Sequence, residues 1–207
     1  MVTKNVSPAL HDALDALDPR ARELTAQLLR KTDPESLDGR ESRDIVGALA
    51  SLESLADSRQ TGETRASVFT PTLAEHGWTS KRTIVQICTD DAPFLVDSVT
   101  AAIADFGLTL HLLVHPVLSV RRDEAGSLVD LDARGGRLES WMHFETDRIP
   151  TEDARRALLA RLQVVLGDVH AAVADWRRLR RACLDIVADL RTEAPPTVSS
   201  DAVSSTV

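Results

Sequence analysis

The stretch from Arg82 to Gly107 constrains the fold most, because its hydrophobic period changes within a few residues. The segment "RTIVQIC" is rich in β-branched residues and partly alternates, as a strand does. The segment "PFLVDSVTAAIADF" then follows a helical period, and Gly107 comes where a helix C-cap favours glycine. One stripe of this helix carries Leu95, Val99, Ile103 and Phe106. We therefore predict a strand that turns directly into a helix.

The residues that follow predict two more strands and a second helix. "LTLHLLVHPVLSVRR" alternates, and "LESWMHFETD" reads as a further strand after turn-like residues. "PTEDARRALLARLQVVLG" has an acidic first turn and ends at Gly167, as a helix does. The next segment "DVHAAVAD", residues 168–175, alternates like a strand, but its alanines suit a helix equally well. Periodicity leaves both alternatives open there.

The two ends of the chain have a different character. Residues 7–31 predict two short helices interrupted at Asp18, and Ser42–Ala56 predicts a third. "DSRQTGETRASVFTPTLAEHGWTSK" has no sustained period and reads as a connector, so we place a domain boundary near Thr70–Ser80. "WRRLRRACLDIVADLR" predicts a basic amphipathic helix, and "TEAPPTVSSDAVSSTV" predicts a disordered tail.

Length and charge exclude several classes of function. A chain of 207 residues suffices for one core and a helical extension. A formal net charge of -8 argues against nucleic acid as a partner, and it gives no reason to expect an anionic membrane surface. Cys88 and Cys183 lie far apart without metal-binding or redox spacing. With no signal peptide and no apolar run of about 18 residues, we expect a cytoplasmic protein without a membrane partner.

The sequence offers little for catalysis or metal binding. His111 and His115 form HxxxH, but on a strand four residues span roughly 13 Å, too far for one metal ion. These imidazoles are expected on the less apolar face of a sheet. No phosphate-binding glycine motif and no nucleophile elbow occurs. We predict no catalytic residue, no metal and no cofactor in this chain.

The corner "TDDAPF" carries the candidate site. Asp90 and Asp91 precede a helix, so one use for them is to cap its first turn, where Pro93 is tolerated. The other use is binding, because the helix N-terminus attracts a carboxylate and the aspartates attract an ammonium group. An α-amino acid has both charges. Both alternatives stay open, and the candidate effector residues are Asp90, Asp91, Ala92, Pro93 and Phe94.

At these residues the chain resembles the N-terminal region of the large bacterial NAD-specific glutamate dehydrogenases. The resemblance is carried by "TIVQICTDDAPFLVDSVTAAIADFGLTLHLLVHPVLSVRRD", "ESWMHFE" and "DVHAAVADWRRL", and it extends from about Leu28 to about Leu190. It implies an ACT-like module with the order βαββαβ, ahead of a dehydrogenase domain that uses NAD, and it favours a strand at 168–175. ACT modules bind amino-acid effectors at subunit interfaces through the corner loop, here Thr89–Phe94. Many have glycine after the loop proline, so Phe94 would crowd a ligand or fill the core.

The prediction is therefore an α/β (α+β) protein with a ferredoxin-like ACT sandwich, an antiparallel sheet with two helices on one face. The predicted parts are a helical segment over 1–75, the ACT-like domain over 80–176, a helix over 177–191 and a disordered tail over 192–207. The opposite sheet face, with His111, Leu113 and His115, is expected to lack cover and to form an interface.

The predicted function is a non-catalytic regulatory and assembly module of an NAD-dependent glutamate dehydrogenase. Its expected partners are a second copy of the chain or the rest of the parent enzyme, with a small amino acid as effector. NAD is expected in the parent enzyme and not in this chain. The alternatives are a purely structural oligomerisation scaffold and a free-standing amino-acid-sensing ACT protein.

Overall fold

A computed structural model describes residues 8–33, 39–131 and 133–193. The chain forms two compact units, residues 1–166 and residues 167–207.

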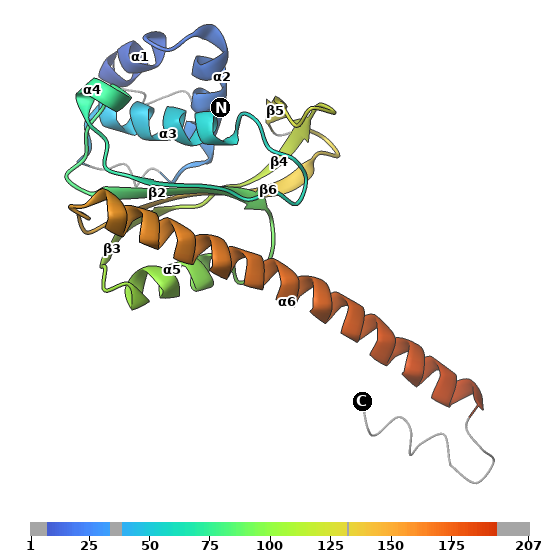
Figure 1. Ribbon diagram of the computed structural model, residues 1–207. Helices are drawn as coiled ribbons and strands as arrows, with labels where there is room; N and C mark the ends of the chain where they lie inside the picture. The colour runs from blue at the N-terminus through green and yellow to red at the C-terminus, as the bar shows by residue number, and fades with distance from the viewer. Residues whose placement is uncertain (1–7, 34–38, 132, 194–207) are drawn as a thin grey trace. The chain divides into compact units, whose positions relative to one another are not determined.

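The first unit is built on one six-stranded antiparallel sheet (Figure 1). Its longest strand, β6, lies at the centre and pairs with β2, β3 and β4, while β1 and β5 occupy the edges. The bounds are β1 Arg65–Phe69, β2 Thr83–Asp90, β3 Leu110–Val114, β4 Val117–Arg122, β5 Leu128–Leu131 and β6 Arg137–Thr146.

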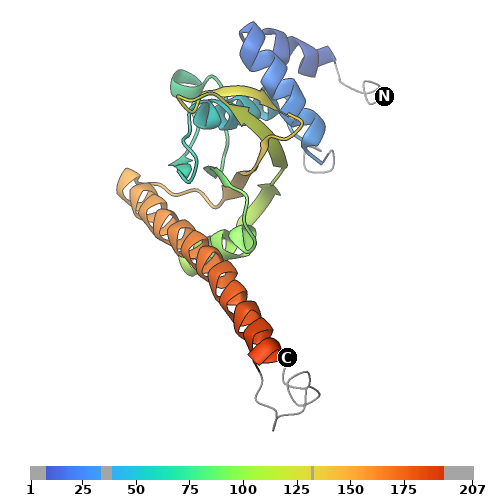
Figure 2. The ribbon, with the colours of Figure 1, turned by 90° about the vertical axis from the view of Figure 1, so that its right-hand side faces the viewer.

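Three N-terminal helices cover one face of this sheet (Figure 1 and Figure 2). They are α1 Pro8–Asp15, α2 Pro19–Lys31 and α3 Ser42–Ala56. Gln86 on β2 donates to the backbone carbonyl of Ala48 on α3 at 2.8 Å, which fixes α3 over the centre of the sheet. The core on this face combines helix and sheet residues: Leu24, Leu28, Ile45, Leu49, Leu52, Ala56, Cys88, Leu118, Val120, Leu128, Leu131 and Trp141.

The other face carries α5 (Leu95–Asp105) and the first part of α6 (Glu152–Glu193), up to Leu166. Burial of the predicted α5 stripe, Leu95, Val99 and Ile103, explains why this helix forms. On α6 the fully buried residues are Leu158, Leu162 and Leu166. The predicted fold class, a mixed α/β protein with an antiparallel ACT-like sheet, is confirmed.

Two predicted elements are wrong. Residues 168–175 are not a strand, because α6 continues through Gly167 to Glu193 and includes the predicted helix over 177–191. The sheet edge along β2 is instead occupied by β1, which lies inside the helical segment 1–75, in the part from residue 57 onward that is predicted as a connector. Residues 168–175 form a helix because their alanines are strong helix formers. They are also not needed at the edge of the sheet, since β2 already pairs with β1 on one side and β6 on the other. The tail predicted over 192–207 lies, from residue 194 onward, outside the described residues.

The predicted uncovered sheet face is also wrong. Because α1–α3 pack on the face opposite α5, both faces of the sheet are covered within the chain. Leu113 pairs with Phe144, and His115 contacts Ser140, so both lie on the α5 side. The single strand predicted around them is two strands, β3 and β4, which are separated at His115 and Pro116.

The second unit, as far as it is described, is the continuation of α6 from Gly167 to Glu193. By length and composition alone α6 would also suffice to cross a membrane. One such helix is weak evidence for a membrane span, and α6 is buried in the first unit through Leu158, Leu162 and Leu166.

Candidate functional site

In the β2–α5 corner, the side chains of Asp90 and Asp91 form hydrogen bonds with other parts of the chain and not with the first turn of α5. Asp90 ends β2, and its Oδ1 accepts from the Nη2 of Arg59 at 2.5 Å. Its Oδ2 accepts from the backbone N–H of Gly62 at 2.9 Å. The N-cap residue of α5 is Phe94, and no side chain caps this helix. The alternative that Asp90 or Asp91 caps α5 is therefore wrong.

Asp91 belongs to a polar chain on the α5 side of the sheet. Its backbone N–H donates to the carbonyl of Leu138 at 3.0 Å, and its Oδ1 accepts from the Ser140 hydroxyl at 2.6 Å. The Oγ of Ser140 lies 3.1 Å from Nε2 of His115. Burial lowers the pKa of His115, which the negative charge of Asp91 opposes only in part.

Asp91, Ser140 and His115 have the residue types of a hydrolase triad but not its order. In a triad the histidine lies between the carboxylate and the serine and removes the serine proton. Here Ser140 lies in the middle and directs its proton to Asp91, so His115 does not activate it as a nucleophile. The Ser140 side chain is also fully buried. The arrangement locks the corner to β6 and carries no acyl-transfer chemistry.

Phe94 is the most unusual residue of the corner. Among the described residues it is the one non-glycine with positive φ, at 71°, a conformation that costs an L-residue about 1–2 kcal/mol. Its side chain is 68% exposed, so it does not fill the core. Pro93 is also exposed, and Ala92 is half-buried. Strain at an exposed aromatic residue beside an uncapped helix N-terminus marks this corner as a place where a ligand or partner could relieve it.

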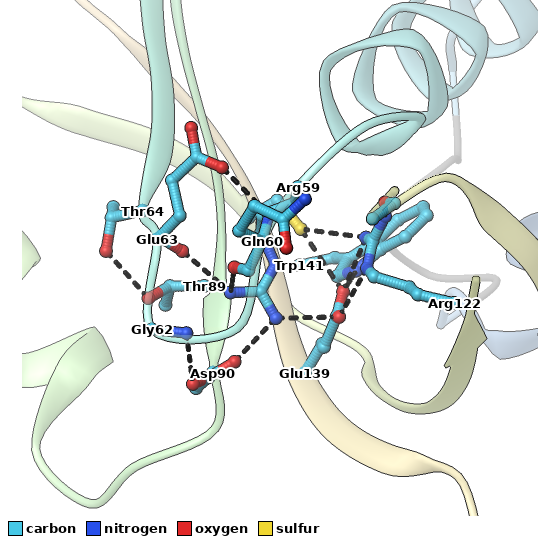
Figure 3. Close-up of polar contacts among 12 residues, drawn as sticks. Arg59, Gln60, Gly62, Glu63, Thr64, Thr89, Asp90, Arg122, Glu139 and Trp141 are labelled. Atoms are coloured by element: carbon cyan, nitrogen blue, oxygen red, sulfur yellow. Dashed lines mark hydrogen bonds and ion pairs between the residues drawn. The ribbon is translucent and has the colours of Figure 1, made fainter. Parts of the chain in front are cut away.

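A buried ion cluster lies on the other side of the same corner (Figure 3). Arg59 is 1% exposed and donates from Nη2 to Glu139 Oε1 at 2.7 Å, as well as to Asp90. Arg122 donates to both oxygens of Glu139, at 2.8 and 2.9 Å. Trp141 adds an indole N–H to Glu139 Oε2 at 3.0 Å. One carboxylate thus holds together the segment after α3, β4 and β6.

The cluster is electrostatically matched. Burial by itself would raise the pKa of Glu139, but hydrogen bonds from Arg122, Arg59 and Trp141 outweigh it and lower the pKa to about 2. The Cys88 thiol beside this carboxylate has a raised pKa, because it is buried and faces the negative charge of Glu139. Cys88 is therefore a neutral thiol without nucleophilic character.

The structure brings the five corner residues together but separates the three predicted interface residues. His111 is exposed, and its Nε2 lies 2.7 Å from Asp147 Oδ1. Leu113 and His115 are half-buried on the α5 side. Their role as an interface stays a prediction. Among the described residues no group of three or more His, Cys, Asp or Glu side chains is placed to hold a metal ion.

Sequence reasoning missed Arg59, Arg122 and Glu139. Glu139 alternates with Trp141 and His143 in "LESWMHFE", so it shares their sheet face. A carboxylate on a buried face requires a cationic partner. That signal predicts an arginine partner but not which arginine.

The fold and the corner define an ACT-like α/β domain. The chain belongs to the family described as the glutamate dehydrogenase ACT1 domain, whose model matches residues 24–162. A curated NAD-specific glutamate dehydrogenase from Pseudomonas aeruginosa is 32% identical over 158 residues, covering 74% of this chain. One from Halomonas elongata is 31% identical over 170 residues, covering 79%. The chain spans only 10% of the length of each of these relatives.

Proposed function

We propose that this chain is a non-catalytic regulatory and assembly module of an NAD-dependent glutamate dehydrogenase of the cytoplasm. One observation carries the proposal. The chain spans 10% of the length of proteins named NAD-specific glutamate dehydrogenase, and this part matches the family model of an ACT domain. The parent reaction is the oxidation of glutamate to 2-oxoglutarate with NAD, which is bound elsewhere in the parent. The geometry of Ser140 and Cys88, neither of which is activated, supports a role without chemistry.

We propose further that the β2–α5 corner binds a small amino acid. The first-turn amides of α5 lack a side-chain cap and would hold the carboxylate. Asp91 is exposed and lies three residues before the N-cap Phe94. Its Oδ1 accepts a hydrogen bond from Ser140, and its negative charge would attract the ammonium group. Asp90 has a different task, since Arg59 and Gly62 occupy both of its oxygens.

Isothermal titration of the chain with a panel of amino acids tests the effector half. We expect one amino acid to release heat, and Asp91→Asn to weaken its binding at least about 10-fold while keeping the acceptor for Ser140. Asp130→Asn is the matched control, because Asp130 lies on β5 in an exposed pair with Arg121. Silence for every amino acid would overturn effector binding. A response unchanged in Asp91→Asn would move the site elsewhere.

A second candidate function, a structural scaffold without an effector, is favoured by one observation. The exposed ring of Phe94 projects from the position next to the uncapped amides, where many ACT modules have glycine. If the ring closes the site, Phe94→Gly gains amino-acid binding that the native chain lacks. The same titration therefore separates a sensor from a scaffold.

A further inference from the structure

The second unit exposes a regular apolar stripe on α6. Along the helix the stripe residues follow one another by four, three, four, three and four positions, which is the heptad pattern of a coiled-coil seam. We call this set the α6 seam: Ala172, Trp176, Leu179, Cys183, Ile186 and Leu190. The four large apolar side chains among them, Trp176, Leu179, Ile186 and Leu190, are 65%, 57%, 57% and 51% exposed.

A helix in this state lacks the packing that normally stabilises helices. Most helical stability in proteins comes from packing of an apolar face and not from helix propensity. From Ala172 to Leu190 the spacings alternate between four and three residues, and this seven-residue repeat keeps one stripe directed at a partner helix. The α6 seam therefore has the form of half an interface.

The charges beside the seam identify the partner. Asp175 and Arg180 flank it at the g and e positions, five residues apart. In a parallel, in-register pair of identical helices, each g residue faces the e residue that is five positions later on the other helix. Asp175 then meets Arg180 of a second copy, and the pair occurs twice by symmetry. Within its own helix Asp175 forms an ion pair with Arg178, but both side chains are exposed and such pairs are weak. Asp175 can therefore still contact Arg180 of the second copy.

We propose that two copies of this chain associate through a parallel coiled coil of their α6 seams. This inference rests on the assembly half of the proposed function and names its partner. In the pair, the a-position Cys183 side chains of the two copies face one another. Leu184 lies outside the seam, although it is 55% exposed, almost as much as Leu179.

The experiment measures mass by light scattering over a wide concentration range, on the whole chain. We expect a concentration-dependent rise to twice the mass of one chain, and a dissociation constant raised about 100-fold or more in Leu179→Asp. Leu184→Asp is the matched control and should leave association unchanged. Both side chains are exposed, so circular dichroism should show that both variants keep the fold. One-chain mass at every concentration, or equal effects of the two variants, overturns the proposal.

Oxidation tests the orientation. Diamide takes up the two hydrogens as two Cys183 thiols form one disulfide, so the native chain should give a covalent dimer quickly. Cys183→Ser should give none, since Cys88 is fully buried, and Leu179→Asp should form it much more slowly. A dimer by mass without rapid cross-linking would overturn the parallel arrangement. A monomer whose seam instead binds vesicles of anionic lipid would make this a membrane face and also refute the proposal.

These outcomes are separable from the proposed function. A monomeric chain that still binds an amino acid at the β2–α5 corner would overturn the seam while leaving the regulatory role intact. A dimer that binds no amino acid would do the reverse.

Discussion

Replacing Arg59 with methionine should destabilise the chain more than any exposed arginine substitution. The guanidinium is 1% exposed and donates to Glu139, Asp90 and the carbonyl of Glu63. Removing one partner of a buried ion pair costs about 3–5 kcal/mol. Arg122 still holds both oxygens of Glu139, so we expect the lower end, about 3 kcal/mol.

Urea and thermal unfolding, followed by circular dichroism, measure this loss. A loss of about 3 kcal/mol should lower the melting temperature by roughly 6–12 °C in a domain of this size. Arg121→Met is the matched control, because Arg121 is 61% exposed, 3.5 Å from Asp130, and should change stability by less than about 1 kcal/mol. If Arg59→Met unfolds within about 0.5 kcal/mol of the native chain, the buried cluster does not hold the first unit together.

The remaining predictions concern acid, the corner and the α3 contact. Glu145 on β6 resembles Glu139: burial by itself would raise its pKa, but hydrogen bonds from His143 and Arg40 lower it to about 2. Because both carboxyl groups have a pKa of about 2 in the folded state and 4.5 ordinarily, their stabilisation is complete above pH 4.5 and is lost as pH falls towards 2. A free energy of unfolding that stays flat over this range contradicts this. Phe94→Gly should raise the free energy of unfolding in urea by about 0.5–1 kcal/mol, because the gain from relieving the positive φ exceeds the entropy cost of glycine. Phe94→Ala keeps the strain and should show no such gain. Gly47→Ala should destabilise the chain by about 1–3 kcal/mol, although alanine is the better helix former, because the new Cβ would lie 2.4 Å from the Trp78 side chain. Increased stability would refute that contact.

The sequence predicts the elements whose period is regular. Helix α3 has the predicted bounds Ser42–Ala56, and the β2-to-α5 transition lies where the period changes. Strand β1 is missed because it is five residues long and lies in a segment without a sustained hydrophobic period. It is a strand because β2 offers it an edge, and that is a tertiary effect.

The same limit applies to the site and to the C-terminal helix. The corner Asp90–Phe94 is correctly placed between a strand and a helix, but the partners of its aspartates come from distant parts of the chain. Arg59 lies 31 residues before Asp90 and 80 before Glu139, so no local pattern identifies it. At residues 168–175 the alternation of Val169, Ala171 and Val173 fits a strand or a helix, and helix propensity decides.

Glutamate-dependent reduction of NAD by the isolated chain tests the central claim most directly. The absorbance of NADH is followed with glutamate and NAD in excess, and a full-length NAD-specific glutamate dehydrogenase serves as the positive control. We predict no NADH from this chain at any concentration, because its role is to assemble and regulate the parent enzyme. NADH production that increases in proportion to the amount of chain would contradict the account.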